Sequence, residues 1–223
     1  MVRPAALDPP EVQQQLWSGF PKVANGWDVG ANCGQSLPHM VEFCQRISCF
    51  EPDPSSAQYL RDHFDGRPGW LVKTFEFAVS DRNGEVPLAW ATQEQHETGQ
   101  LCTPGTQGME WSPADWSSVE VVSCRSVTAD TLVAGGGAIP GFVKVDTEGH
   151  EIHVLTGAMG ILSLGTVSWL IEFHSPENLS HCLGRLKGAG YDPEVIRHPH
   201  YPEGSPMWHQ HGWVKAIARG VGG

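Results

Sequence analysis

The feature of this chain that most constrains its fold is an alternation of short apolar runs with amphipathic stretches. The apolar runs occupy 22–30, 46–52, 70–80, 141–149, 166–174 and 211–219. The intervening stretches predict helices at about 34–45, 55–65, 127–134, 150–160 and 176–189. Alternating strands and helices favour a parallel sheet covered by helices on both faces. We therefore predict an α/β fold, and a chain of 223 residues suits a single domain over 1–223.

Two segments depart from this alternation. Residues 91–118 are polar and rich in turn residues, so we expect an excursion from the sheet there. Residues 197–219 contain two strand-like runs joined by a Pro/Gly-rich connection, which predicts an antiparallel hairpin that ends the sheet. Residues 1–20 precede the first strand and predict a short N-terminal cover.

Charge and apolar content narrow the class of partner. The chain has 14 basic and 25 acidic residues, and the formal charge of −11 opposes attraction to nucleic acid. No apolar run approaches the roughly 20 residues of a membrane span, and the first residues lack the apolar core of a secretory signal. We expect a cytoplasmic protein with no nucleic-acid or membrane partner. Six cysteines without a C-x-x-C pair predict reduced, mostly buried thiols.

The stretch "DVGANCGQS" follows the first apolar run and contains Gly30 and Gly34. Glycines in a strand-to-helix turn let the backbone approach a ligand, and helix N-terminal amides favour an anionic group. The spacing does not match the G-x-G-x-x-G dinucleotide fingerprint, which disfavours an NAD-dependent oxidoreductase. Glu51 ends the second run, where a carboxylate can accept the hydroxyls of a ribose held over the turn.

Five motifs, "DVGANCGQS", "FEPDPSS", "FAVSDRNGEVPL", "VKVDTEGHE" and "IEFH", occur in the order and rough spacing of the FkbM-type S-adenosylmethionine-dependent methyltransferases. The chain resembles that family over about residues 23–175. The resemblance implies a class I methyltransferase (Rossmann-like) fold, doubly wound, with a mostly parallel seven-stranded sheet and an antiparallel C-terminal strand. It also implies O-methylation of a hydroxyl on a small molecule, either a natural product or a sugar.

The resemblance also implies which residues bind S-adenosyl-L-methionine. Asp28, Gly30, Asn32 and Gly34, with Ser36 beside them, would line its methionine end, and Glu51 would hold the ribose hydroxyls. Ala78, Val79 and Ser80 would border the adenine. For Ala78 and Val79, burial in the strand core is the alternative.

The catalytic candidates come from the ends of the fourth and fifth apolar runs. Asp146 follows a buried strand, and Glu172 and His174 end the next one, so we expect them at the ligand-binding edge of the sheet. We predict His174 as the base that takes the proton from the acceptor hydroxyl, with Asp146 and Glu172 orienting it. A hydrogen-bonded histidine at a strand end is the plain alternative. Glu151 is interpreted as helix-start chemistry and His153 as packing.

A divalent metal site is a rival interpretation of the same groups. The candidate ligands for Mg²⁺ or Mn²⁺ are Asp146, Glu148, Glu172 and His174. Four C-terminal histidines could face each other across the hairpin: His198, His200, His209 and His211.

The sequence predicts an acceptor wall built from the 91–118 excursion and the C-terminal segment. Its aromatic candidates are Trp90, His96, Trp111, Trp116, Tyr201 and Trp208, although tryptophan is also common in cores. Because the N-terminal cover is short, the pocket is either open or completed by a partner, which leaves room for a homo-oligomer. A non-catalytic S-adenosylmethionine-binding partner or scaffold is the alternative function, and retention of "DTEGHE" and "IEFH" favours the enzyme.

Overall fold

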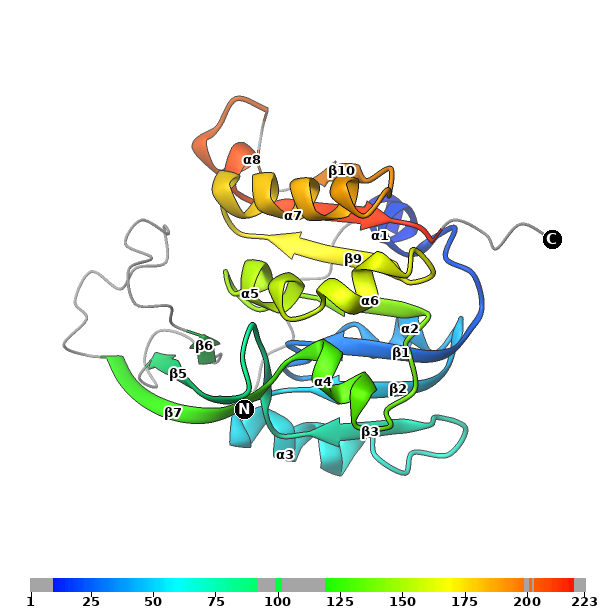
Figure 1. Ribbon diagram of the computed structural model, residues 1–223, viewed down its shortest axis with the longest axis vertical. Helices are drawn as coiled ribbons and strands as arrows, with labels where there is room; N and C mark the ends of the chain where they lie inside the picture. The colour runs from blue at the N-terminus through cyan, green and yellow to red at the C-terminus, as the bar shows by residue number, and fades with distance from the viewer. Residues whose placement is uncertain (1–9, 92–98, 102–118, 199–200, 202, 219–223) are drawn as a thin grey trace.

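The computed structural model describes residues 10–91, 99–101, 119–198, 201 and 203–218. Its main sheet contains seven strands, which lie one above another across Figure 1. In spatial order they are β10 (Glu194–Arg197), β11 (Gly212–Ala216), β9 (Ser168–Phe173), β8 (Phe142–Val145), β1 (Val23–Val29), β2 (Cys44–Phe50) and β3 (Val72–Phe75). β11 runs antiparallel to both neighbours, and the other pairs are parallel. The predicted mostly parallel sheet with an antiparallel C-terminal strand is confirmed.

Helices cover both faces of the main sheet, and each layer packs on its own apolar core. One core joins the sheet to α1 (Pro10–Trp17), α2 (Leu37–Met40) and α3 (Pro54–His63). The other joins it to α4 (Ala129–Ala134), α5 (Glu151–Thr156), α6 (Met159–Ser163) and α7 (Pro176–Gly188). A last helix, α8 (Pro206–Gln210), lies in the connection of the C-terminal hairpin. This three-layer arrangement is the doubly wound fold that the sequence predicts.

A second, four-stranded sheet lies beyond one end of the main sheet, at the left of Figure 1. Its strands in spatial order are β4 (Ala78–Val79), β7 (Val119–Val127), β5 (Gly84–Ala91) and β6 (Gly99–Leu101). The predicted single strand over 70–80 is therefore wrong, because β3 and β4 belong to different sheets. Phe77 lies between them and packs its ring on Phe50 and Phe75, at centroid distances of 5.5 and 6.0 Å.

The residues on either side of the predicted excursion form β5 and β7, which both belong to the second sheet. Residues 92–98 and 102–118, which make up most of the excursion, lie outside the described residues.

Two predicted helices are shorter than expected. The helix predicted at 34–45 is reduced to α2, and the chain after it continues in tight turns. The helix predicted at 150–160 is broken into α5 and α6 at Gly157 and Ala158. A side chain at Gly157 would collide with the Ser80 carbonyl, so the glycine allows the close approach of these two segments.

In the described part of the chain, no helix has the length and apolar character needed to cross a membrane. The five cysteines there are free thiols, and Cys44, Cys49 and Cys182 are buried. Cys33 and Cys124 are half-buried, and Cys102 lies outside the described residues.

Phe142 lies in the apolar core between the sheet and the helices α1, α2 and α3, and its replacement tests that core. It is fully buried in β8 and meets the rings of Phe20 and Phe43 edge-on, at 4.7 and 5.0 Å. We expect Phe142→Ala to lower the free energy of unfolding by about 3–5 kcal/mol in urea titrations. Leu71→Ala is the control, because Leu71 is exposed, and a change within about 0.5 kcal/mol is expected. Equal losses in the two variants would contradict this description of the core.

Candidate functional site

The register of four neighbouring parallel strands brings the predicted site residues into one row. Phe50, Val29, Val145 and Ile171 are paired across β2, β1, β8 and β9. The residues one position further along each strand therefore lie side by side at the carboxyl edge of the sheet. They are Glu51, Gly30, Asp146 and Glu172. Ligands bind at this edge in open α/β sheets, so the register alone creates a candidate site.

A buried ion pair lies directly beneath this row. Asp28 and Lys144 are register partners on β1 and β8, and Lys144 Nζ lies 3.2 Å from Asp28 Oδ1 and 3.3 Å from Asp146 Oδ2. The same ammonium donates a hydrogen bond to the Gly30 carbonyl at 3.0 Å. Burial lowers the pKa of Lys144, but Asp146 and Asp28 outweigh it and hold the pKa above its usual value. Lys144 thus ties the glycine turn to the strand that carries Asp146.

Sequence reasoning missed Lys144, although a lysine inside the otherwise apolar run "FVKV" was a usable signal. Asp28 has no exposed surface and is paired with Lys144, so its predicted contact with a cofactor stays a prediction.

The turn after β1 uses left-handed backbone at Gly30, Asn32 and Gly34. A Cβ at Gly30 would collide with the Asp146 carbonyl, and one at Gly34 would approach the Phe64 ring to 2.7 Å. Both glycines therefore make room for protein atoms, whereas the sequence suggested room for a ligand. Asn32 is not a glycine, but asparagine adopts left-handed backbone more readily than most other side chains, so this residue suits the turn.

Glu51 holds this turn through both of its oxygens. Oε2 accepts a hydrogen bond from the Asn32 backbone N–H at 2.8 Å, and Oε1 accepts one from Asp53 N–H at 2.9 Å. Burial raises the pKa of Glu51 to about 7, although these N–H donors act to lower it. Each carboxylate oxygen keeps a further lone pair for a ligand hydroxyl.

The remaining predicted cofactor residues have mixed surroundings. Ala78 and Val79 are buried in β4, and the Val79 side chain belongs to the apolar core, as the alternative interpretation had it. Ser80 is fully buried, and its hydroxyl lies 2.9 Å from His150 Nε2. Ser36 lines a cavity described below. Cofactor contacts of these four residues stay predictions.

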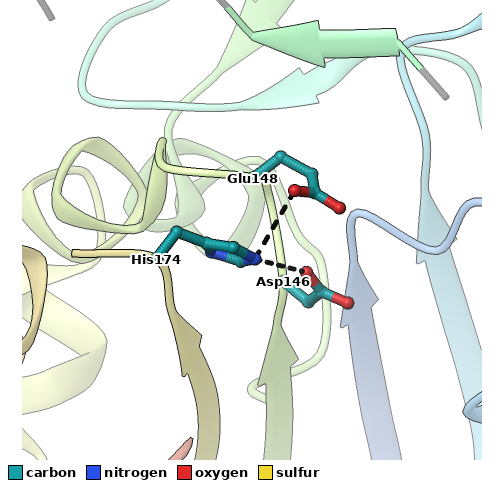
Figure 2. A group of neighbouring side chains, drawn as sticks. All are labelled: Asp146, Glu148 and His174. Atoms are coloured by element: carbon teal, nitrogen blue, oxygen red, sulfur yellow. Dashed lines mark ion pairs between the residues drawn. The ribbon is translucent and has the colours of Figure 1, made fainter. Parts of the chain in front are cut away.

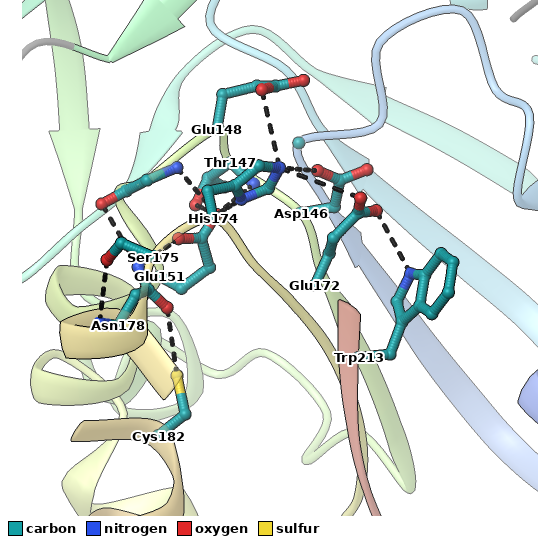
Figure 3. A network of polar contacts seen from close by, with 12 residues as sticks. Asp146, Thr147, Glu148, Glu151, Glu172, His174, Ser175, Asn178, Cys182 and Trp213 are labelled. Carbon is teal, nitrogen blue, oxygen red and sulfur yellow. Dashed lines mark hydrogen bonds and ion pairs between the residues drawn. The ribbon is translucent and has the colours of Figure 1, made fainter. Parts of the chain in front are cut away.

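Glu151 is the residue whose role the sequence most underestimated. Its carboxylate is fully buried and accepts hydrogen bonds from Thr147 N–H and Gly149 N–H at 2.9 and 3.0 Å. It also lies 3.2 Å from His174 Nδ1 and accepts a hydrogen bond from Asn178 (Figure 3). The backbone bonds agree with the predicted helix-start chemistry. The contact with His174 adds a second role, because it fixes the orientation of the imidazole.

His174 is only 8 % exposed, and its Nε2 faces three carboxylates. The distances from Nε2 are 3.5 Å to Glu148, 3.8 Å to Asp146 and 3.8 Å to Glu172 (Figures 2 and 3). Burial lowers the pKa of His174, but the charge of Glu151, with Glu148 and Glu172, outweighs it and raises the pKa well above its usual value. The predicted convergence of Asp146, Glu172 and His174 is thus what the structure shows.

Glu172 connects this cluster to β11. Its Oε2 accepts a hydrogen bond from Trp213 Nε1 at 3.2 Å. Burial raises the pKa of Glu172 well above its usual value, and the neighbouring Asp146 adds to the effect. Glu172 therefore gives up its proton less readily than an ordinary glutamate.

Three of the four predicted metal ligands come together. One ligand atom from each of Asp146, Glu148 and His174 lies within 4.8 Å of the others (Figure 2), and this is the one such group among the described residues. The predicted pairing of C-terminal histidines is not seen there: His198 stacks on Trp213 at 4.9 Å, His211 contacts the His174 ring edge-on at 5.4 Å, and His209 is exposed. His200 lies outside the described residues. His153, predicted as packing, lies 3.1 Å from Asp81.

The predicted acceptor wall is mostly outside the described residues, as His96, Trp111, Trp116 and the Trp90 side chain are. Tyr201 packs on His198 and His211 at 4.9 and 5.6 Å, and Trp208 is half-buried.

The described residues form a cavity that the sequence did not predict. A cavity of about 200 Å³, here named the α1 cavity, opens between α1 and the carboxyl edge of the sheet. Its lining includes Ser36, Asp146, Glu172, Trp17 and Trp213.

The chain matches a known protein family over most of its length. Residues 28–193 match the family described as the methyltransferase FkbM domain. The chain belongs to this family. The matched range begins at Asp28 and includes every predicted catalytic and cofactor-binding residue, so the resemblance noted in the sequence is confirmed as family membership.

Two characterised proteins are similar to this chain at low identity. Hexuronic acid methyltransferase AglP of Haloferax volcanii is 26% identical over 166 residues, which cover 72% of this chain and 62% of AglP. The 2-O-methyltransferase NoeI of Sinorhizobium fredii is 25% identical over 143 residues, 61% of this chain and 58% of NoeI. This chain thus spans about three fifths of the length of either relative.

A solved structure supports the fold. The FkbM methyltransferase of Methylobacillus flagellatus superposes with a TM-score of 0.63 at 16% identity, over 94% of this chain and 48% of that one. At this identity the likeness concerns the fold alone.

The ionisation of His174 can be measured directly by NMR titration of labelled histidine side chains. We expect His174 to keep its proton at pH values well above the usual histidine pKa. For His211 we expect the opposite, because burial, followed by the charge of His174, lowers its pKa to about 4. Glu148→Gln should lower the pKa of His174, because it removes a negative charge 3.5 Å from Nε2. Glu177→Gln, on the exposed start of α7, is the control. A His174 that loses its proton below pH 6 would contradict this electrostatic picture.

Proposed function

We propose that this protein is an S-adenosylmethionine-dependent O-methyltransferase acting on a hydroxyl of a small molecule. The observation that carries the proposal is the juxtaposition, along one edge of the sheet, of the Glu51-braced turn with Asp146, Glu172 and His174. Membership in the FkbM family supports methyl transfer. The names of two distant relatives, a hexuronic acid methyltransferase and a 2-O-methyltransferase, support oxygen as the acceptor atom.

The residues of the turn suit S-adenosylmethionine on chemical grounds. Glu51 offers carboxylate lone pairs for the two ribose hydroxyls, and the side-chain oxygen of Asn32 is buried without a hydrogen-bond partner, so it is open to a donor from a ligand. Gly30, Gly34 and Ser36 would border the methionine end. When bound, S-adenosylmethionine supplies an electrophilic methyl group on a cationic sulfonium.

The excess of carboxylates at this edge suits a cationic ligand. Asp28, Asp146, Glu148, Glu151 and Glu172 surround two basic groups, Lys144 and His174. Charge complementarity of this kind favours a ligand with a positive centre over a neutral one.

His174 is the group proposed to take the acceptor proton. Glu151 faces Nδ1, so the neutral imidazole keeps its proton on Nδ1 and leaves Nε2 as the acceptor. Asp146 and Glu172 would orient the acceptor hydroxyl toward Nε2. Because the pKa of His174 is raised, activity should increase as the pH rises through that pKa and the imidazole loses its proton.

A divalent ion on Asp146, Glu148 and His174 is the rival assignment. We favour the proton-transfer role, because Asp146 is already paired with Lys144, whose charge would repel a divalent ion on the same carboxylate. The family and structural comparisons add no support for a metal.

Cofactor binding is tested by calorimetric titration with S-adenosylmethionine and S-adenosylhomocysteine. We expect binding by the wild-type protein and a loss of about tenfold or more in Glu51→Gln, which weakens acceptance of two ribose hydroxyls. Glu76→Gln is the control, because Glu76 pairs with Arg61 at the surface, and its affinity should not change. Thermal melts establish that the Glu51 variant is folded. Absence of binding by the wild-type protein would remove the proposed function.

Catalysis is tested with methyl-labelled S-adenosylmethionine and a panel of hydroxylated small molecules. His174→Gln should lower kcat by about a hundredfold or more and leave cofactor affinity unchanged, as expected for the loss of a general base. His181→Gln, on the exposed side of α7, is the matched control. The wild-type rate should increase with pH above neutrality.

Two results would contradict this mechanism. A His174→Gln enzyme with wild-type kcat would exclude the base. Loss of activity on chelation, restored by Mn²⁺, would establish the metal assignment in its place.

A further inference from the structure

The α1 cavity adjoins the predicted catalytic groups on the α1 face of the sheet. Asp146 and Glu172 line it, and Ser36 brings the end of the glycine turn to the same space. A molecule in this cavity would therefore touch both the cofactor turn and the carboxylates, which is the placement that a methyl acceptor requires.

Two tryptophan–histidine stacks form aromatic walls of the cavity. Trp17 stacks on His39 with ring centroids 5.0 Å apart, and Trp213 stacks on His198 at 4.9 Å. The two pairs come from opposite ends of the chain. Aromatic faces of this kind bury the apolar C–H face of a ring.

The polar groups of the lining are hydroxyl-binding groups. Gln13 and Gln35 contribute neutral amides, and Asp146 and Glu172 contribute carboxylate oxygens that accept hydrogen bonds from hydroxyls. The volume of about 200 Å³ is below the roughly 300–1,000 Å³ of sites for drug-sized ligands. One ring is therefore the matching size.

The charges of the lining disfavour an anionic ring. Among the described residues that line the cavity, Lys144 is the one lysine or arginine. It is already paired with Asp28 and Asp146. Burial lowers the pKa of His39, so this ring is neutral at neutral pH. A carboxylate or phosphate on the acceptor would therefore have to compete with Asp146 for two cations that are already paired, Lys144 and His174, which is unfavourable.

We propose that the α1 cavity is the acceptor site and that it takes an uncharged sugar ring in preference to a uronate or a sugar phosphate. This inference rests on the proposed O-methyltransferase function. It sets the chain apart from its relative AglP, whose name specifies a hexuronic acid.

The test compares matched pairs of methyl hexosides and methyl hexuronosides that differ only at C6. Initial rates of label transfer from S-adenosylmethionine give kcat/KM for each member. We expect the neutral member to be preferred by about tenfold or more in each accepted pair. Equal rates, a preference for the uronate, or no transfer to any neutral member would overturn the proposal.

A charge introduced into the lining tests the location of the site. Gln35 lines the cavity and its side chain is exposed, so Gln35→Lys adds a cation there with little risk to folding. We expect it to raise the relative rate on uronates by about tenfold. Gln14→Lys adds the same charge to an exposed position of α1 away from the cavity, and it should leave the ratio unchanged. Equal ratios in the two variants would place the acceptor elsewhere.

Calorimetry on the same preparations separates the two proposals. Failure to bind S-adenosylmethionine would remove the O-methyltransferase assignment itself. Normal cofactor binding with a preference for uronates would remove only the inference about the α1 cavity.

Discussion

The parallel register of β2, β1, β8 and β9 is the constraint on which the site depends. The pairing of these strands puts four residues from distant parts of the sequence into one row: Glu51, Gly30, Asp146 and Glu172. A slip of one residue on any strand would turn its side chain to the opposite face of the sheet. The row is held from below by Lys144, which contacts Asp28, Asp146 and the Gly30 carbonyl.

The second requirement is charge balance among ionisable groups that are partly or fully buried. Carboxylates at the sheet edge raise the pKa of His174. Burial, with Asp146 beside it, raises the pKa of Glu172. Glu151 behaves differently: burial alone would raise its pKa, but His174 and neighbouring N–H donors lower it to about 2. A lowered pKa favours the ionised form of Glu151, which places a negative charge 3.2 Å from Nδ1 of His174.

The sequence predicted the alternation of strands and helices in the main sheet and the polar residues at the strand ends, because hydrophobic runs and the residues that follow them are local signals. It could not predict which groups pair in space. The position of Lys144 in an apolar run signals a buried charge but does not identify Asp28 and Asp146 as its partners. Glu151 has the sequence position of an ordinary first-turn carboxylate. The small second sheet was missed because β5 and β7 pair across a long insertion, and the break at Gly157 depends on the distant Ser80 carbonyl. The α1 cavity is lined by residues from both ends of the chain, and no local sequence pattern specifies that they meet.

A crystal structure of the complex with S-adenosylhomocysteine tests the central claim most directly. The account predicts that the ribose hydroxyls lie on Glu51 and that the sulfur atom faces the space between Asp146, Glu172 and the α1 cavity. His174 Nε2 should face the same space. A complex in which the sulfur points away from Asp146 and the cavity, or in which Glu51 makes no contact with the ligand, would contradict it.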